Sequence, residues 1–79
     1  MFENKKVLVT GGSGMIGREL VKLLKSENAI VHIADLNEPI DMEFDYFHKV
    51  NLLFYDDCIQ ICKGMDYVFN LVGIKCSPK

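Results

Sequence analysis

Three glycines, at positions 11, 14 and 17, lie between an apolar segment and a segment with helical periodicity. Gly11 would allow a tight turn after a strand, and Gly14 would leave room for a diphosphate beside the backbone. Gly17 would let the helix pack closely against the strand. The amides of the first helical turn, with the helix dipole, would attract the anion. This pattern predicts a dinucleotide phosphate loop, with contacts from Gly11, Ser13, Gly14, Met15, Ile16 and Gly17.

Two other interpretations fit part of the same stretch. A strand, turn and helix without a ligand would need similar glycines, and this alternative stays open. A phosphate loop of the nucleoside-triphosphatase type has the glycine spacing of Gly12 and Gly17, but it requires Lys and then Ser or Thr next. Arg18 and Glu19 occupy those two positions, so that alternative fails.

A carboxylate closes the second apolar segment of the chain. Asp35 follows residues 29–34, a run typical of a parallel strand that is buried on both faces. A carboxylate there can accept hydrogen bonds from the adenosine ribose hydroxyls, and it repels the 2′-phosphate of NADP. Residues 36–38, which begin with the expected contact Leu36, offer no cation, so the pattern favours NAD. A helix cap or a solvated turn is the alternative role for Asp35.

Hydrophobic periodicity predicts an α/β chain with four strands and two helices. The strands are expected over residues 5–9, 29–34, 46–50 and within 64–73, and the helices over 14–27 and 55–63. Right-handed crossovers would place helices on both faces of a Rossmann-like parallel sheet of order 3-2-1-4, a partial doubly wound domain. The ligand crevice would open at the carboxyl ends of the first and fourth strands.

The same periodicity predicts which side chains face the sheet. In the first helix these are Ile16, Leu20, Leu23 and Leu24, with Arg18, Glu19, Lys22 and Lys25 facing away. In the second helix we expect Ile59 and Cys62 to face the sheet, with Cys58 a further candidate. The charges of residues 38–45 are expected to form a solvated face. His32 is expected to be packed or edge-facing rather than a ligand, and His48 is expected to be exposed.

Length and composition indicate one small globular domain. The chain has 79 residues, 49% of them hydrophobic and 25% charged, and a net charge of −2. This charge gives no reason to expect nucleic acid or a membrane surface as a partner. Cys58, Cys62 and Cys76 are odd in number and lack a CxxC pair, which favours buried free thiols over a disulfide or metal site. With no apolar leader or spanning run in the sequence, we expect a cytoplasmic location.

The residues Thr10-Gly11-Gly12-Ser13-Gly14-Met15-Ile16-Gly17 form a TGxxGxxG pattern after an apolar strand. The chain resembles the extended short-chain dehydrogenase/reductase family, the NAD-dependent epimerases and dehydratases that act largely on nucleotide sugars. The GxGxxG and TGxxxGxG patterns of related families fit less well. The resemblance covers essentially the whole chain and implies NAD as cofactor.

Later segments of the sequence are also similar to this family. Residues 64–73 resemble its G-x-D-x-V-x-H-L-A segment, with Asn70 in place of His and Val72-Gly73 in place of Ala-Ala. The resemblance implies that Leu71, Val72 and Gly73 lie beside the ribose and nicotinamide. It also implies that Asn51 and Leu52, where the family usually has Asp-Leu, lie beside the adenine. An ordinary turn is an equally good role for Asn51.

The acid/base pair of the family, Tyr followed four residues later by Lys, has no match in the chain. Tyr46, Tyr55 and Tyr67 are followed at that spacing by Val50, Ile59 and Leu71. Residues 1–79 are therefore interpreted as an N-terminal NAD(P)-binding Rossmann half-domain, a fragment of a longer enzyme that is inactive alone. The alternative is a freestanding, non-catalytic dinucleotide sensor or interaction module. The fragment interpretation also predicts that the isolated chain is only marginally stable or self-associates through the unpartnered edge of the fourth strand.

Overall fold

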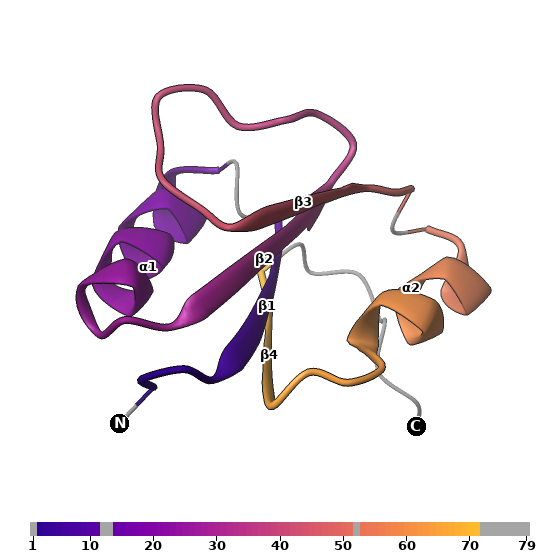
Figure 1. The fold of residues 1–79 in the computed structure, drawn as a ribbon. Helices are drawn as coiled ribbons and strands as arrows, with labels where there is room; N and C mark the ends of the chain where they lie inside the picture. The colour runs from indigo at the N-terminus through magenta and orange to yellow at the C-terminus, as the bar shows by residue number, and fades with distance from the viewer. Residues whose placement is uncertain (1, 12–13, 52, 72–79) are drawn as a thin grey trace.

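The computed structural model describes residues 2–11, 14–51 and 53–71. Within these ranges the chain alternates strands and helices in the predicted order, and every predicted boundary agrees to within a few residues. The elements are β1 (Lys6–Thr10), α1 (Met15–Ser26), β2 (Ile30–Asp35), β3 (Tyr46–Lys49), α2 (Tyr55–Cys62) and β4 (Tyr67–Asn70) (Figure 1).

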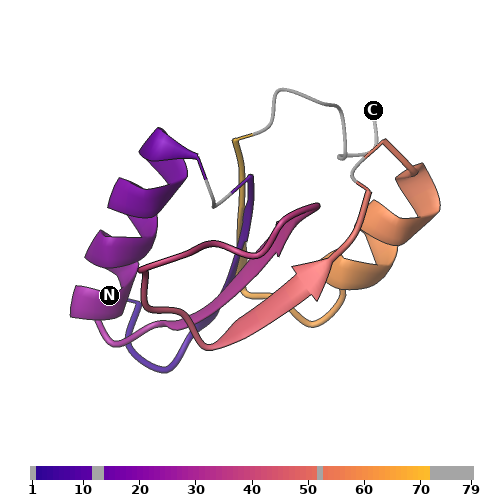
Figure 2. The ribbon, with the colours of Figure 1, turned by 90° about the horizontal axis from the view of Figure 1, so that it is seen from above.

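The four strands form one parallel sheet of order β3-β2-β1-β4, as the sequence predicts. Figure 2 shows α1 on one side of this sheet and α2 on the other. This arrangement follows from right-handed crossovers, which bring each connecting helix back over the sheet on a fixed side. The Rossmann-like fold class is therefore confirmed.

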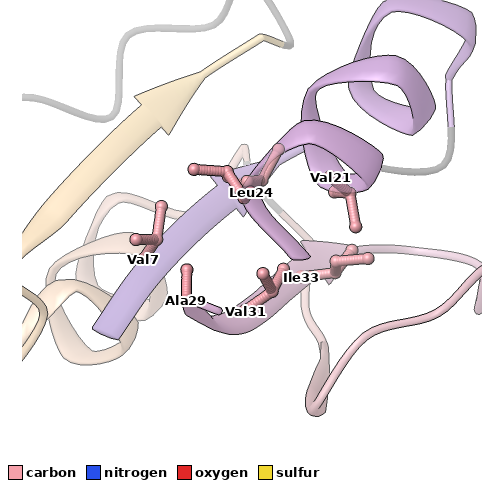
Figure 3. Close-up of a cluster of buried hydrophobic side chains, with 7 residues drawn as sticks. Val7, Val21, Leu24, Ala29, Val31 and Ile33 are labelled. Atoms are coloured by element: carbon pink, nitrogen blue, oxygen red, sulfur yellow. The ribbon is translucent and has the colours of Figure 1, made fainter. Parts of the chain in front are cut away.

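One hydrophobic core lies between the sheet and α1. Its buried members are Val7, Val9, Val21, Leu24, Ala29, Val31 and Ile33 (Figure 3). The prediction for α1 is wrong in part, because Ile16 and Leu23 are 73% and 59% exposed. The helix instead buries Gly17, Val21 and Leu24, which form an adjacent stripe with i, i+4, i+7 spacing.

A second, smaller core lies under α2. Leu8, Ala34 and Cys58 are buried there, and Ile61 and Cys62 pack against them. Ile61 therefore takes the place predicted for Ile59, whereas the placement of both cysteines is confirmed. Burial, followed by the neighbouring Cys58, raises the pKa of the Cys62 thiol. Across the described residues, no three His, Cys, Asp or Glu side chains are grouped to hold a metal ion.

An ion pair joins the end of α1 to the starts of β2 and β3. Lys25 Nζ lies 2.7 Å from Asp45 Oδ2 and also donates to the Ala29 carbonyl, and the same carboxylate accepts the Val31 N–H at 2.7 Å. Burial alone would raise the pKa of Asp45, but the bonds from Lys25 and Val31 outweigh it and lower that pKa. Neither the predicted outward orientation of Lys25 nor a purely solvated role for Asp45 is correct.

Two histidines form a cross-strand pair on the α2 face. His32 Nδ1 on β2 lies 2.9 Å from His48 Nε2 on β3, and the Tyr46 ring stacks on His32 with centroids 4.6 Å apart. His48 is half-buried, so its predicted exposure is wrong, whereas the packed environment predicted for His32 is confirmed. Burial lowers the pKa of His32, with a further contribution from His48.

The histidine pair should make the protein less stable in mild acid. Because the pKa of His32 is below the ordinary value of 6.5, the unfolded chain binds more protons there than the native protein. The free energy of unfolding should therefore fall as the pH drops through and below 6.5. Urea unfolding at pH 7.5 and 5.0 checks this, with His32→Phe as the variant that keeps a ring against Tyr46. The variant should lose less stability than the wild type, and equal losses would contradict the assignment.

β4 forms one edge of the sheet and leaves apolar side chains exposed. Tyr67 and Val68 are 42% and 45% exposed, although Phe2 packs edge-on against Tyr67 and Phe69. Self-association through this edge stays a prediction. Neither helix of the described ranges has the length and apolar character needed to cross a bilayer.

Candidate functional site

The carboxyl ends of the four parallel strands meet at one edge of the sheet. The register pairs Thr10 with both Ala34 and Asn70, and it pairs Asp35 with Lys49. The predicted site residues follow these strand ends, so the fold brings the described ones to a single edge. They are Gly11, Gly14, Met15, Ile16, Gly17, Asp35, Leu36, Asn51 and Leu71. Ser13, Leu52, Val72 and Gly73 lie outside the described residues.

Gly11 makes the turn that leads out of β1. Its φ of 76° lies in the left-handed region that side chains disfavour, which is the conformational role predicted for this glycine. Its N–H donates to the Ala34 carbonyl at 2.9 Å, and its own carbonyl accepts the Gly14 N–H at 3.2 Å. The first bond fixes the glycine-rich turn directly beside the strand end that carries Asp35.

Gly14 is the N-cap of α1 and has a different reason to lack a side chain. Its backbone is extended, with φ −77° and ψ 173°, and a Cβ there would meet its nearest neighbour, the Gly11 carbonyl oxygen, at an ordinary 3.6 Å. The fold therefore tolerates a side chain at this exposed position. A glycine cap also contributes no side-chain acceptor to the first-turn amides. Both features fit a site that a dinucleotide diphosphate approaches from outside.

The first turn of α1 combines exposed and buried positions. Met15 is 84% exposed and Ile16 is also exposed, so both present apolar surface at the mouth of the helix. Gly17 is buried against the core, in agreement with its predicted role in close helix–sheet packing. These three positions could contact a ligand through backbone amides, with apolar side chains beside it.

Asp35 ends β2 next to the glycine-rich turn. It is half-buried, and its Oδ1 accepts the Leu36 N–H at 2.7 Å. This bond holds the carboxylate at the start of the loop of residues 36–45, while a carboxylate has capacity for further donors such as ribose hydroxyls. Leu36 is 51% exposed and offers apolar surface beside it.

Asn51 and Leu71 have structural roles at the same edge. Asn51 Oδ1 accepts the Leu53 N–H at 3.0 Å, and its carbonyl accepts the Phe54 N–H at 3.0 Å, so the residue makes the turn that begins α2. Asn51 therefore has the turn role that the sequence offered as an alternative to a contact with adenine. Leu71 N–H donates to the Thr10 carbonyl at 3.1 Å, which holds the chain after β4 against the end of β1.

A buried polar tie between β1 and β4 was not predicted. The Thr10 hydroxyl, 1% exposed, donates to Asn70 Oδ1 at 2.8 Å. The bond joins the ends of β1 and β4, between which the sequence predicts the ligand crevice. The available signal was the substitution of Asn for the family's His at position 70, in register with the Thr of the glycine motif.

A groove of about 550 Å³ lies elsewhere, between α1 and the loop after β2. Its lining combines basic and acidic side chains, among them Arg18, Lys22, Asp41 and Glu43. The mixed charge gives it no preference for an anion, and it does not include the strand ends. We therefore distinguish this groove from the site predicted at the strand ends.

Comparison with known proteins gives consistent matches over nearly the whole chain. Residues 7–79 match the model of the NAD-dependent epimerase/dehydratase family. A GDP-mannose 3,5-epimerase from Arabidopsis thaliana is 38% identical over 75 residues, which cover 90% of this chain. The chain spans about a fifth of the length of the curated relatives it matches, 20% in that case.

Solved structures give the same result. A short-chain dehydrogenase from Leptospira borgpetersenii with bound NAD+ superposes with a TM-score of 0.78 at 31% identity, covering 92% of this chain and 33% of that one. An epimerase from Methanothermobacter thermautotrophicus superposes with a TM-score of 0.76 at 31% identity, covering 92% and 24%.

Proposed function

Because the chain belongs to the NAD-dependent epimerase/dehydratase family, we propose that residues 1–79 form the N-terminal NAD-binding half-domain of a longer nucleotide-sugar epimerase or dehydratase. The proposed NAD contacts are Gly11, Ser13, Gly14, Met15, Ile16, Gly17, Asp35, Leu36, Asn51, Leu52, Leu71, Val72 and Gly73. The cytoplasmic location stays a prediction.

One observation gives the proposal most of its support. The hydrogen bond from the Gly11 N–H to the Ala34 carbonyl joins the turn before α1 to the strand end that carries Asp35. A diphosphate at the first turn of α1 would therefore have a carboxylate beside it for the neighbouring ribose.

NAD, when bound, supplies a nicotinamide ring that can accept a hydride from a sugar carbon. The residues of this chain would bind and orient it: first-turn amides at the diphosphate, Asp35 at the ribose hydroxyls, and Leu36 against the adenosine. The acid/base groups that move protons on the sugar would come from the remainder of the longer protein, because none of Tyr46, Tyr55 and Tyr67 is followed by the family's Lys. We expect residues 1–79 alone to show no turnover.

The carboxylate of Asp35 gives the most direct test of cofactor choice. Asp35→Ala should weaken NAD binding about 10- to 100-fold, because hydrogen bonds to a charged acceptor contribute about 1.5–3 kcal/mol each. NADP binding should fall less, since the variant also removes the repulsion of the 2′-phosphate. Calorimetric titration with both dinucleotides measures the two effects.

Glu38→Ala is the matched control, because it removes an exposed carboxylate three residues further along the same loop. It should leave the affinity for NAD unchanged. Equal losses in both variants would mean that only general charge matters, and equal affinity of Asp35→Ala and wild type would remove Asp35 from the site.

The reading frame beyond Lys79 separates the proposed enzyme from a freestanding nucleotide sensor. An enzyme requires a continuation that carries the Tyr and Lys of the family at their four-residue spacing. A continuation without this pair, or a stop codon, would favour the non-catalytic module.

A further inference from the structure

Arg18, at the start of α1, reaches across to the loop that joins β2 to β3. Its Nη1 donates to the Ile40 carbonyl at 2.8 Å, and its Nη2 donates to the Asp41 carbonyl at 3.2 Å. Nη1 also lies 3.8 Å from Met42 Sδ. The planar fork of the guanidinium is therefore fitted to two consecutive carbonyls, although the sequence predicts that Arg18 faces away from the fold.

The loop needs such a contact to keep this shape. Asp41 has a φ of 59°, in the left-handed region that residues other than glycine adopt uncommonly, although Asp does so more often than most. Of the two carbonyls that Arg18 binds, one belongs to the preceding Ile40 and the other to Asp41 itself. Within the segment Ile40–Met42, the backbone conformation is thus supported by a side chain from a different element.

The position of Arg18 connects two parts of the proposed cofactor site. It directly follows Gly17, in the helical turn proposed to bind the diphosphate, and the loop that it holds begins with Asp35 and Leu36. One side chain thus links the diphosphate end of the site to the segment that would bind the adenosine ribose. A salt bridge from Lys22 to Glu19 further along α1 makes no such connection.

We propose that Arg18 is a positioning residue for the adenosine half of NAD: its guanidinium holds the loop of residues 36–45 on α1 and so keeps Asp35 and Leu36 at the diphosphate-binding turn. The inference rests on the proposed function. It assigns Arg18 no contact with the cofactor, and it explains why a cation close to the glycine motif need not favour NADP.

Arg18→Met removes the donors and keeps much of the aliphatic stem, and Arg18→Lys keeps the charge and one donor group. Lys22→Met is the control on the same helix, because Lys22 is exposed and its pair with Glu19 at 3.9 Å is a weak surface contact. Two quantities are measured for each protein: amide hydrogen exchange of residues 36–45 without ligand, and calorimetric Kd values for ADP-ribose, NAD and NADP.

Arg18→Met should accelerate exchange in the loop and weaken ADP-ribose and NAD binding about tenfold, the effect of losing roughly one ordinary hydrogen bond. Arg18→Lys should recover part of both effects, and Lys22→Met should match the wild type. Faster exchange with unchanged ADP-ribose affinity would overturn the positioning role while leaving the proposed function intact. A loss specific to NADP would also overturn it, because Arg18 would then bind the 2′-phosphate. Failure of the wild type to bind ADP-ribose and NAD would overturn the proposed function itself.

Discussion

Gly14→Val should weaken NAD binding by at least about 100-fold, while the free energy of unfolding changes by less than about 1 kcal/mol. The backbone at Gly14 is extended, and a Cβ there would make only an ordinary 3.6 Å contact with the Gly11 carbonyl oxygen, so the fold accommodates a side chain. The branched side chain would instead occupy the space of the diphosphate at the mouth of α1. Calorimetry with NAD and urea unfolding measure the two quantities on the same sample.

Gly11→Ala is the matched comparison, because the two glycines belong to one turn. The φ of 76° at Gly11 makes any side chain costly, by about 1–2 kcal/mol. Stability should therefore fall in Gly11→Ala and be preserved in Gly14→Val. If Gly14→Val still bound NAD like the wild type, the phosphate-loop assignment would be wrong.

Leu24→Ala should destabilise the protein by about 2–5 kcal/mol, the cost of removing a fully buried leucine and leaving a cavity. Leu24 is 1% exposed in the core between α1 and the sheet (Figure 3). In a domain of this size such a loss is a large part of the total stability. Chemical unfolding followed by circular dichroism measures it.

Leu23→Ala is the control, because it makes the same chemical change at an exposed position of the same helix. Leu23 is the preceding residue and is 59% exposed, so its loss should change the free energy of unfolding by less than about 0.5 kcal/mol. The sequence predicts that both leucines face the sheet. Similar costs for the two variants would mean that the helix is rotated relative to the structure described.

The strand order was predictable because it follows from general rules. Short apolar runs that alternate with amphipathic helices require parallel strands, and the handedness of the crossovers then fixes which face each helix covers. The glycine motif also predicted a tight turn at Gly11 and close packing at Gly17. These features depend on residues near one another in the sequence.

The face of α1 was predicted less well because the helix has two adjacent apolar stripes. Ile16, Leu20 and Leu23 form one, and Gly17, Val21 and Leu24 form the other, rotated by a single residue. Periodicity alone cannot choose between them. The stripe with Gly17 contacts the sheet, since a glycine allows the closest approach of the two backbones, and Ile16 is left exposed at the mouth of the helix.

Polar contacts between distant segments could not be predicted from the sequence. Arg18 binds main-chain carbonyls, which carry no residue-specific signal, and Lys25 pairs with Asp45 only because α1 ends beside the start of β3. The tie between Thr10 and Asn70 likewise depends on strand register. The turn at Asn51 differs, because an Asn shortly before a helix is a local signal for it.

Backbone amide NMR of the protein during titration with NAD+ tests the central claim most directly. We expect saturable shifts concentrated at Gly11, at residues 14–17 and at Asp35 and Leu36. The amide of Gly64, in the turn before β4 at the opposite end of the strands, should be unaffected. Spectra that do not change with NAD+, or shifts confined to the groove around residues 41–43, would contradict the proposed dinucleotide site.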